Sequence, residues 1–169
     1  MTVQTHDSSP SSTPAAECRL KTVESNLLPQ HLMLLDESAV DTDVAVAAGC
    51  RSIEEVAGLP EEFGYLSDDQ VPGLIFPWHP VDQSFPTVLQ YRPDEPMQKD
   101  GKPVKYVFPL GKSAPLGIHP AMRERLPHAP RIVIVEGTKQ YLAVTSVLKS
   151  DPTVAVLGTP GCRGWSKNK

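Results

Sequence analysis

The sequence predicts an α/β protein in three parts: small N-terminal helices, a small mixed or antiparallel sheet, and one parallel strand–helix–strand unit. Helical spacing of apolar residues and capping signals fill residues 25–70. Short apolar runs separated by Pro, Asp and Gly turns occupy residues 71–130, which is typical of antiparallel strands. Two further apolar runs within residues 131–169 flank a helical pattern, and this order is typical of a parallel βαβ unit.

Residues 1–24 are rich in Ser, Thr and Pro and predict a disordered tail. Leucines then recur along one helical face of residues 25–40. A second helix is predicted to end at Gly49, and a third to begin at Ser52, because Ser52 and Glu55 have the spacing of a capping box. We interpret these short helices as scaffold.

Three strands are predicted in the middle part, at residues 73–78, 87–92 and 104–108. Alternation puts Gln90 and Arg92 on one face of the second strand, and Lys105 on one face of the third. Arg92 and Lys105 can therefore project from neighbouring strands into one groove. The residue types alone also fit two ordinary solvated cations.

The run of β-branched residues within 131–136 predicts a central strand buried on both faces. Gly137 follows as the tight turn, and Thr138 is the predicted cap of a helix. Glu136 then lies at the C-terminal end of a parallel strand, where open α/β sheets bind their ligands. This position makes Glu136 a candidate for chemistry, although a carboxylate there can also cap the next turn.

A second buried strand is predicted at residues 153–157, closed by Gly158. If the chain is a fragment that lacks further strands, the edge at residues 154–157 is expected to be exposed and prone to association. The glycines and cations that follow, with Trp165 among them, predict a solvated loop over the end of the sheet.

Net charge, cysteine spacing and the lengths of apolar runs exclude several classes of protein. A net charge of −4 argues against a generic basic coat for nucleic acid, but it allows a local basic cleft. The three cysteines are widely spaced without a CxxC, which argues against a zinc ribbon and suits a reducing compartment. No apolar run reaches the roughly 18 residues of a membrane span, and the N-terminus lacks an apolar signal core. We therefore expect a cytoplasmic protein without a membrane partner.

Five segments in order resemble the catalytic core of bacterial-type primases, most closely the primase-like domains of plasmid and phage replication proteins: VPGLIFPWHPV, QYRPD, KPVKYVFP, RIVIVEGTKQYLAV and VAVLGTPG. In that family a small α/β lobe precedes a TOPRIM domain, the metal-binding fold shared with topoisomerases. The resemblance covers residues 24–165 and implies that residues 131–169 are a partial TOPRIM-like βαβ unit. Its most specific part is the strand that ends in Glu-Gly, with the helix and the Leu-Gly strand that follow.

The resemblance also implies roles for single residues. Glu136 matches a glutamate that acts as general acid or base or helps to hold Mg²⁺, and Gly137 and Gly158 match turn glycines. DNA or RNA and other replication proteins are the implied partners. Arg92 and Lys105 match basic residues that face template or nucleotide in the primases. Lys139 matches a lysine of related phage and plasmid sequences.

One departure leaves two functions open. A TOPRIM site needs an Asp-x-Asp pair on a later strand, because Mg²⁺ in phosphoryl transfer takes several oxygen ligands. No such pair follows Gly158, so the catalytic site is expected to be incomplete, either in a fragment or in a naturally short relative. The first hypothesis is a primase-like region that acts on nucleic acid with Mg²⁺. The second is a non-catalytic module of the same fold that binds nucleic acid or protein.

Overall fold

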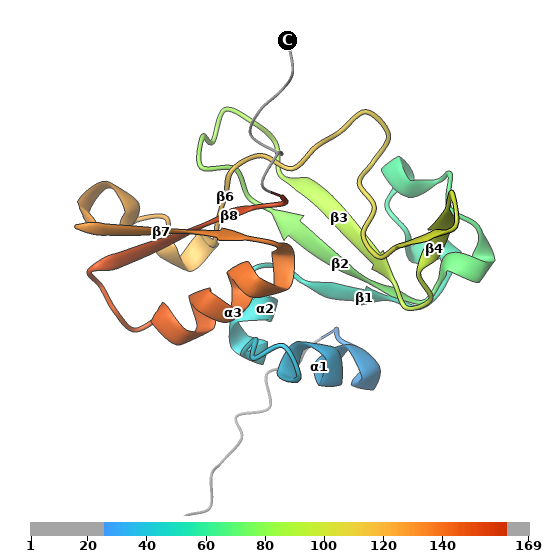
Figure 1. The fold of residues 1–169 in the computed structure, drawn as a ribbon, viewed down its shortest axis with the longest axis horizontal. Helices are drawn as coiled ribbons and strands as arrows, with labels where there is room; N and C mark the ends of the chain where they lie inside the picture. Colours follow the sequence, from blue (N-terminus) through green and yellow to red (C-terminus); the bar gives the residue numbers. More distant parts are fainter. Residues whose placement is uncertain (1–25, 162–169) are drawn as a thin grey trace, which may run out of the picture.

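The computed structural model describes residues 26–161 and contains both helices and strands, so the prediction of a mixed α/β protein is confirmed (Figure 1). Its strands form sheets in the orders β1-β2-β3, β4-β5 and β6-β8-β7, and all described pairs but one are antiparallel. The predicted tail at 1–24 and the predicted loop around Trp165 lie outside the described residues. None of the helices among residues 26–161 is long and apolar enough to cross a membrane.

The first two predicted helices are present as α1 (Pro29–Asp36) and α2 (Thr42–Ala47), with proline in the first turn of α1. The third is wrong, because Arg51–Ile53 is strand β1. The Ser52 hydroxyl accepts a hydrogen bond from the N–H of Leu28 at 2.7 Å and contacts His31 Nδ1 at 2.6 Å, so it is not available to cap a helix. Single 3-10 turns follow at Val56–Gly58, Glu61–Phe63 and Asp68–Gln70.

Two of the three middle strands form where the short runs between turns predict them, as β2 (Gly73–Trp78) and β3 (Val88–Pro93). The third is displaced toward the N-terminus: β5 (Lys102–Val104) pairs with β4 (Met97–Lys99) in a hairpin. The chain then returns to β3 through one backbone bridge, in which Tyr91 and Val107 exchange two hydrogen bonds of 2.9 Å. This bridge carries Lys105 to the side of β3.

The C-terminal sheet consists of β6 (Gly117–Ile118), β7 (Arg131–Glu136) and β8 (Val154–Thr159), and α3 (Thr138–Leu148) connects the last two. Single 3-10 turns at Pro120–Met122 and Leu126–His128 lie between β6 and β7. β7 and β8 are parallel neighbours, with Arg131 opposite Val154 and Glu136 opposite Thr159.

The positions of the two apolar strands in this sheet are the reverse of the prediction. β8 is central and buried, whereas β7 lies at the edge, with Ile132 54% and Ile134 64% exposed. The physical reason is β6, which pairs antiparallel with Gly158 and Leu157 and so covers the edge of β8 that was expected to be free.

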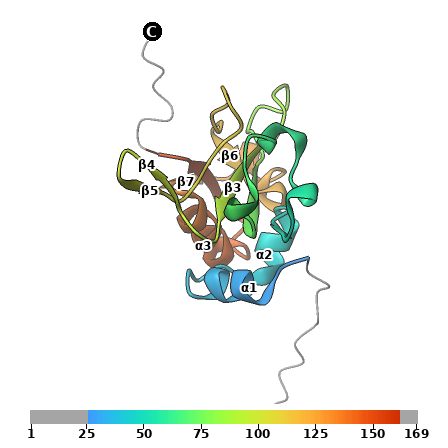
Figure 2. The ribbon, with the colours of Figure 1, turned by 90° about the vertical axis from the view of Figure 1, so that its right-hand side faces the viewer.

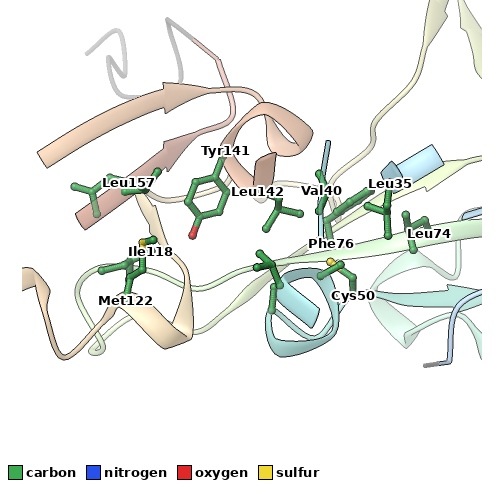
Figure 3. Close-up of a cluster of buried hydrophobic side chains, with 14 of the residues drawn as sticks. Leu35, Val40, Cys50, Leu74, Phe76, Ile118, Met122, Tyr141, Leu142 and Leu157 are labelled. Carbon is green, nitrogen blue, oxygen red and sulfur yellow. The ribbon is translucent and has the colours of Figure 1, made fainter. Parts of the chain in front are cut away.

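The main core lies between the three helices and the two three-stranded sheets (Figures 1 and 3). Leu35 of α1, Phe76 of β2, Leu142 of α3 and Leu157 of β8 all belong to it. A smaller cluster on the other side of the first sheet packs Tyr91 and Ile75 against the 3-10 turns. The turned view in Figure 2 shows α1 and α2 below the sheets and the β4–β5 hairpin extending to one side. The main core thus fixes α3 relative to β2, with which β3 pairs along its whole length.

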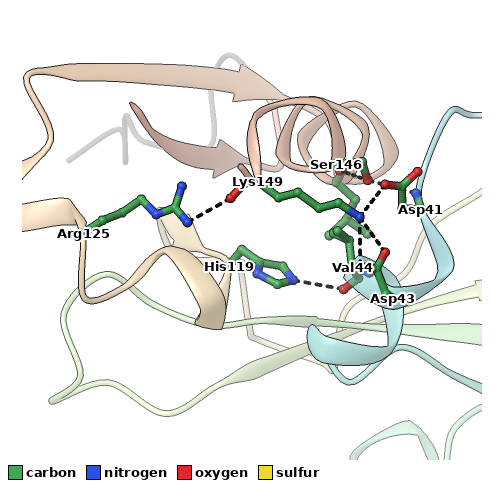
Figure 4. A network of polar contacts seen from close by, with 8 residues as sticks. Asp41, Asp43, Val44, His119, Arg125, Ser146 and Lys149 are labelled. Atoms are coloured by element: carbon green, nitrogen blue, oxygen red, sulfur yellow. Dashed lines mark hydrogen bonds and ion pairs between the residues drawn. The ribbon is translucent and has the colours of Figure 1, made fainter. Parts of the chain in front are cut away.

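Polar contacts join the helices to this frame. The Lys149 ammonium at the end of α3 contacts the carboxylates of Asp41 at 2.7 Å and Asp43 at 2.8 Å, before and in α2 (Figure 4). The hydrogen bond from Lys149 is the main reason why the pKa of Asp43 lies below its ordinary value. Arg125 donates to the carbonyl oxygens of Asp151 at 2.9 Å and Lys149 at 3.0 Å, which fixes the C-terminal end of α3.

Candidate anion-binding cleft

A cavity of about 550 Å³ lies where β3, the segment after β5 and the N-terminus of α3 meet. Arg92 reaches it from β3, next to Gln90 on the same face of that strand, and the Tyr91–Val107 bridge brings Lys105 alongside. Lys139 comes from the first turn of α3. The structure thus brings Arg92, Lys105 and Lys139 to one cavity, although Lys105 lies in the segment after β5 and not on the neighbouring strand that the alternation predicts.

The three cations are close enough to repel one another. The pKa of Lys139 is lowered from its ordinary value of 10.5, first by partial burial and then by the charges of Arg92 and Lys105. Glu37, the residue after α1, opposes this shift but does not cancel it. A bound anion would relieve the repulsion, since it would neutralise charges that the protein leaves uncompensated.

The N-terminus of α3 adds backbone donors to the same cavity. The N–H groups in the first turn of a helix have no partner within the helix, and the helix dipole favours negative charge there. Gly137, Thr138, Lys139 and Gln140 all line the cavity. Gly137 has a φ of +90° and donates its N–H to Thr159 at 2.8 Å, so it is the predicted turn glycine. Cations and helix dipole therefore favour the same kind of ligand, a phosphate or carboxylate.

Gln90 is a residue of this cleft that sequence reasoning missed. Its side chain is buried, with 4% of the residue exposed. Its carbonyl oxygen accepts hydrogen bonds from Trp78 Nε1 at 3.3 Å and from the hydroxyl of Thr138. These two bonds fix the side-chain amide of Gln90, which lines the cleft. The available signal was a lone amide on the same face as Arg92 in an otherwise apolar strand.

Two predictions for this region need correction. Thr138 does not cap α3, because its hydroxyl bonds Gln90 and the N-cap is Gly137. Gly158 is not a turn residue, since β8 continues through it to Thr159. A Cβ on Gly158 would lie 2.7 Å from the ring of Tyr141, so close packing requires glycine at this position.

Glu136 is exposed at the end of β7 and does not line the cleft, although the next residue, Gly137, does. No group of three His, Cys, Asp or Glu side chains that could hold a metal ion occurs among residues 26–161. A Mg²⁺ centre takes several oxygen ligands, and Glu136 supplies one carboxylate. The described residues alone do not form the metal site that the resemblance implies.

A chain of serine, histidine and aspartate beside the cleft is structural. His31 is buried, and its Nδ1 contacts the Ser52 hydroxyl while its Nε2 contacts Asp94 at 2.7 Å. The Ser52 oxygen already accepts the N–H of Leu28. These bonds tie α1 to β1 and to the end of β3, and they hold the serine as a connector rather than as a free nucleophile.

Comparisons of the chain with protein-family models, with curated proteins and with solved structures find no significant match. The likeness to primases therefore remains an expectation from the sequence.

The lowered pKa of Lys139 predicts a pH dependence of anion binding. A phosphate favours the charged lysine, so affinity should fall as pH rises through the lowered pKa, below the ordinary 10.5. Unfolding should respond oppositely: in that window the unfolded chain binds the proton more tightly, so stability rises with pH. Titration of phosphate binding against pH, with Lys139→Arg as the control that stays charged, measures the effect. Equal pH profiles for both proteins would contradict it.

Proposed function

We propose that the cleft binds the phosphate backbone of a single-stranded nucleic acid. In this proposal residues 26–161 bind the strand and do not by themselves catalyse a reaction on it. The observation that carries this proposal is the convergence of Arg92, Lys105 and Lys139 with the start of α3 on one cavity. The chain as a whole is acidic, with a net charge of −4, so general composition does not account for a cluster of cations. Phosphate contacts of this kind supply most of the affinity in binding without sequence preference.

The shape of the surface favours a polymer over a small anion. Arg92 lines the cleft and also a second hollow of about 300 Å³ against α1. This second hollow exposes the apolar side chain of Met33 beside Gln30 and beside the carboxylates of Glu37 and Asp94, which would repel a phosphate placed there. The volumes of the two hollows would still leave a strand whose phosphate contacts Arg92 room for neighbouring nucleotides on both sides.

A second candidate is the primase-like, TOPRIM-type function, in which the protein acts on nucleic acid with Mg²⁺. What favours it is the position of Glu136, at the end of a strand that is parallel to β8 and leads directly into α3. Open α/β sheets bind their ligands at such positions. Acidic ligands beyond Glu136 would be needed for a metal, so we rank this function below binding.

The test is the binding of a fluorescent oligothymidylate, followed by anisotropy between about 50 and 200 mM salt, with and without Mg²⁺. The wild-type chain, Glu136→Gln and the control Glu124→Gln, at another exposed glutamate, are compared. Binding that weakens steeply with salt and is the same in all three proteins, with or without Mg²⁺, supports a cleft that binds the phosphate backbone without catalysis. A Mg²⁺ dependence lost only in Glu136→Gln would support the primase-like alternative. Absence of binding at low salt would overturn both.

A further inference from the structure

The outer edge of β7 has unpaired backbone groups. Arg131 and Gly137 donate their N–H groups toward β8, at 3.2 and 2.8 Å. Alternate residues of a strand direct their backbone groups to opposite edges. Ile132 and Ile134 therefore turn their N–H and C=O groups away from β8, where no strand of the described part of the chain pairs with them.

The same edge is also apolar. Ile132 and Ile134 are 54% and 64% exposed, on the sheet face opposite Val133 and Val135, which pack into the core. Edge strands are normally protected by charges, prolines or bulges along their length. Between Arg131 and Glu136 this strand has none, so it is a template for pairing with another strand (Figure 1, β7).

We propose that the β7 edge pairs antiparallel with the same edge of a second copy, forming a two-fold symmetric dimer. A second copy fits this edge because its exposed residues are their own complement: Ile132 and Ile134 lie symmetrically about Val133, so a two-fold axis beside Val133 superposes each on the other. The charged ends of the strand do not select the partner. Arg131 already donates to Asp151 at 3.0 Å, and in the register below its side chain and the partner's Glu136 lie on opposite sheet faces.

The alternation of the side chains selects a register. Opposed residues of an antiparallel pair share a sheet face, so Ile132 pairs with the partner's Ile134, and the reverse. The four isoleucines then form one patch, and their backbone groups form about four hydrogen bonds. Two six-residue strands cover less than the roughly 1,600 Å² of a standard interface, so the dimer should be weak and depend on concentration.

Sedimentation velocity over a concentration series tests the proposal with Ile134→Lys and the control Val147→Lys. Both substitutions place a lysine at an exposed apolar position, but Val147 lies on α3, away from the β7 edge. Wild type and Val147→Lys should shift from monomer to dimer together, and Ile134→Lys should stay monomeric. A wild type that is monomeric throughout would overturn the proposal, as would dimerisation that Ile134→Lys leaves unchanged. An open series of larger species would also overturn it, because each chain has one β7 edge.

Hydrogen exchange gives a second measurement at the backbone itself. The amides of Ile132 and Ile134 should exchange fast in dilute protein and more slowly when it is concentrated. The amides of Val133 and Val135 should be protected at both concentrations, because their register directs them to β8. Equal exchange of Ile132 and Ile134 at both concentrations would rule out pairing through this edge. No nucleic acid is present in either experiment, so their outcome is independent of the proposed function of the cleft.

Discussion

Gly158→Ala is expected to lower the free energy of unfolding by about 3 kcal/mol, the upper part of the usual range for overpacking a core. The added Cβ would lie 2.7 Å from Cγ of Tyr141 and 2.9 Å from its Cδ2, distances that real Cβ atoms do not show. The Tyr141 ring cannot easily retreat, because it is 6% exposed and stacks on Trp78 with centroids 5.8 Å apart. Trp78 is itself confined, since a Cβ on Gly117 would lie 2.8 Å from its ring. The strain should therefore appear as lost stability.

Urea unfolding measures this loss, with Gly58→Ala as the matched control. A Cβ on Gly58 would meet only Ile53, at an ordinary contact distance of 3.8 Å, so its unfolding midpoint should barely move. A smaller residue at position 141 should relieve the strain, and Tyr141→Leu combined with Gly158→Ala should cost less than the sum of the single changes. Equal midpoints for Gly158→Ala and Gly58→Ala would contradict the packing argument.

Local patterns in the sequence predicted most of the elements. An apolar run located β2 and alternation located β3, and helical spacing with caps located α1 and α2. They did not predict which of two apolar runs lies in the middle of the C-terminal sheet. The answer depends on β6, a strand of two residues, Gly117 and Ile118, that is too short to produce any pattern.

For the candidate site too, local sequence patterns predicted some features and not others. Alternation predicted the face of Arg92, because side-chain direction in a strand is a local property, but Lys105 comes to the same cavity from the segment after β5 and not from the predicted third strand. The role of Gln90 depends on a hydrogen bond to Thr138, which is 48 residues away in the chain. In the same way, the capping-box spacing at Ser52 predicted a helix, but a tertiary contact with His31 uses the hydroxyl. Contacts between distant segments decide both cases, and one sequence does not reveal them.

The cleft makes the strongest prediction about binding. Replacing Arg92, Lys105 and Lys139 together by glutamine should weaken binding of the oligothymidylate by about 100-fold at low salt. It should also make the slope of log affinity against log salt shallower by about 2, because each phosphate contact on a single strand contributes about 0.7. Anisotropy titrations at several salt concentrations give both quantities.

The control for this variant removes the same charge elsewhere. Glutamines at the exposed Lys99, Lys102 and Lys112 also change the net charge from −4 to −7, since each substitution removes one positive charge. If the two triple variants lose affinity equally, the overall charge of the chain, and not the cleft, governs binding.

The stability of the cleft variant separates loss of binding from loss of fold. Partial burial of its charge and then repulsion from Arg92 and Lys105 lower the pKa of Lys139, and both disappear in the cleft variant, so its unfolding midpoint should stay the same or rise while its affinity falls. A lower affinity together with an equal or higher unfolding midpoint is expected for cations that serve a ligand, because a cluster of like charges without its ligand destabilises the protein that contains it.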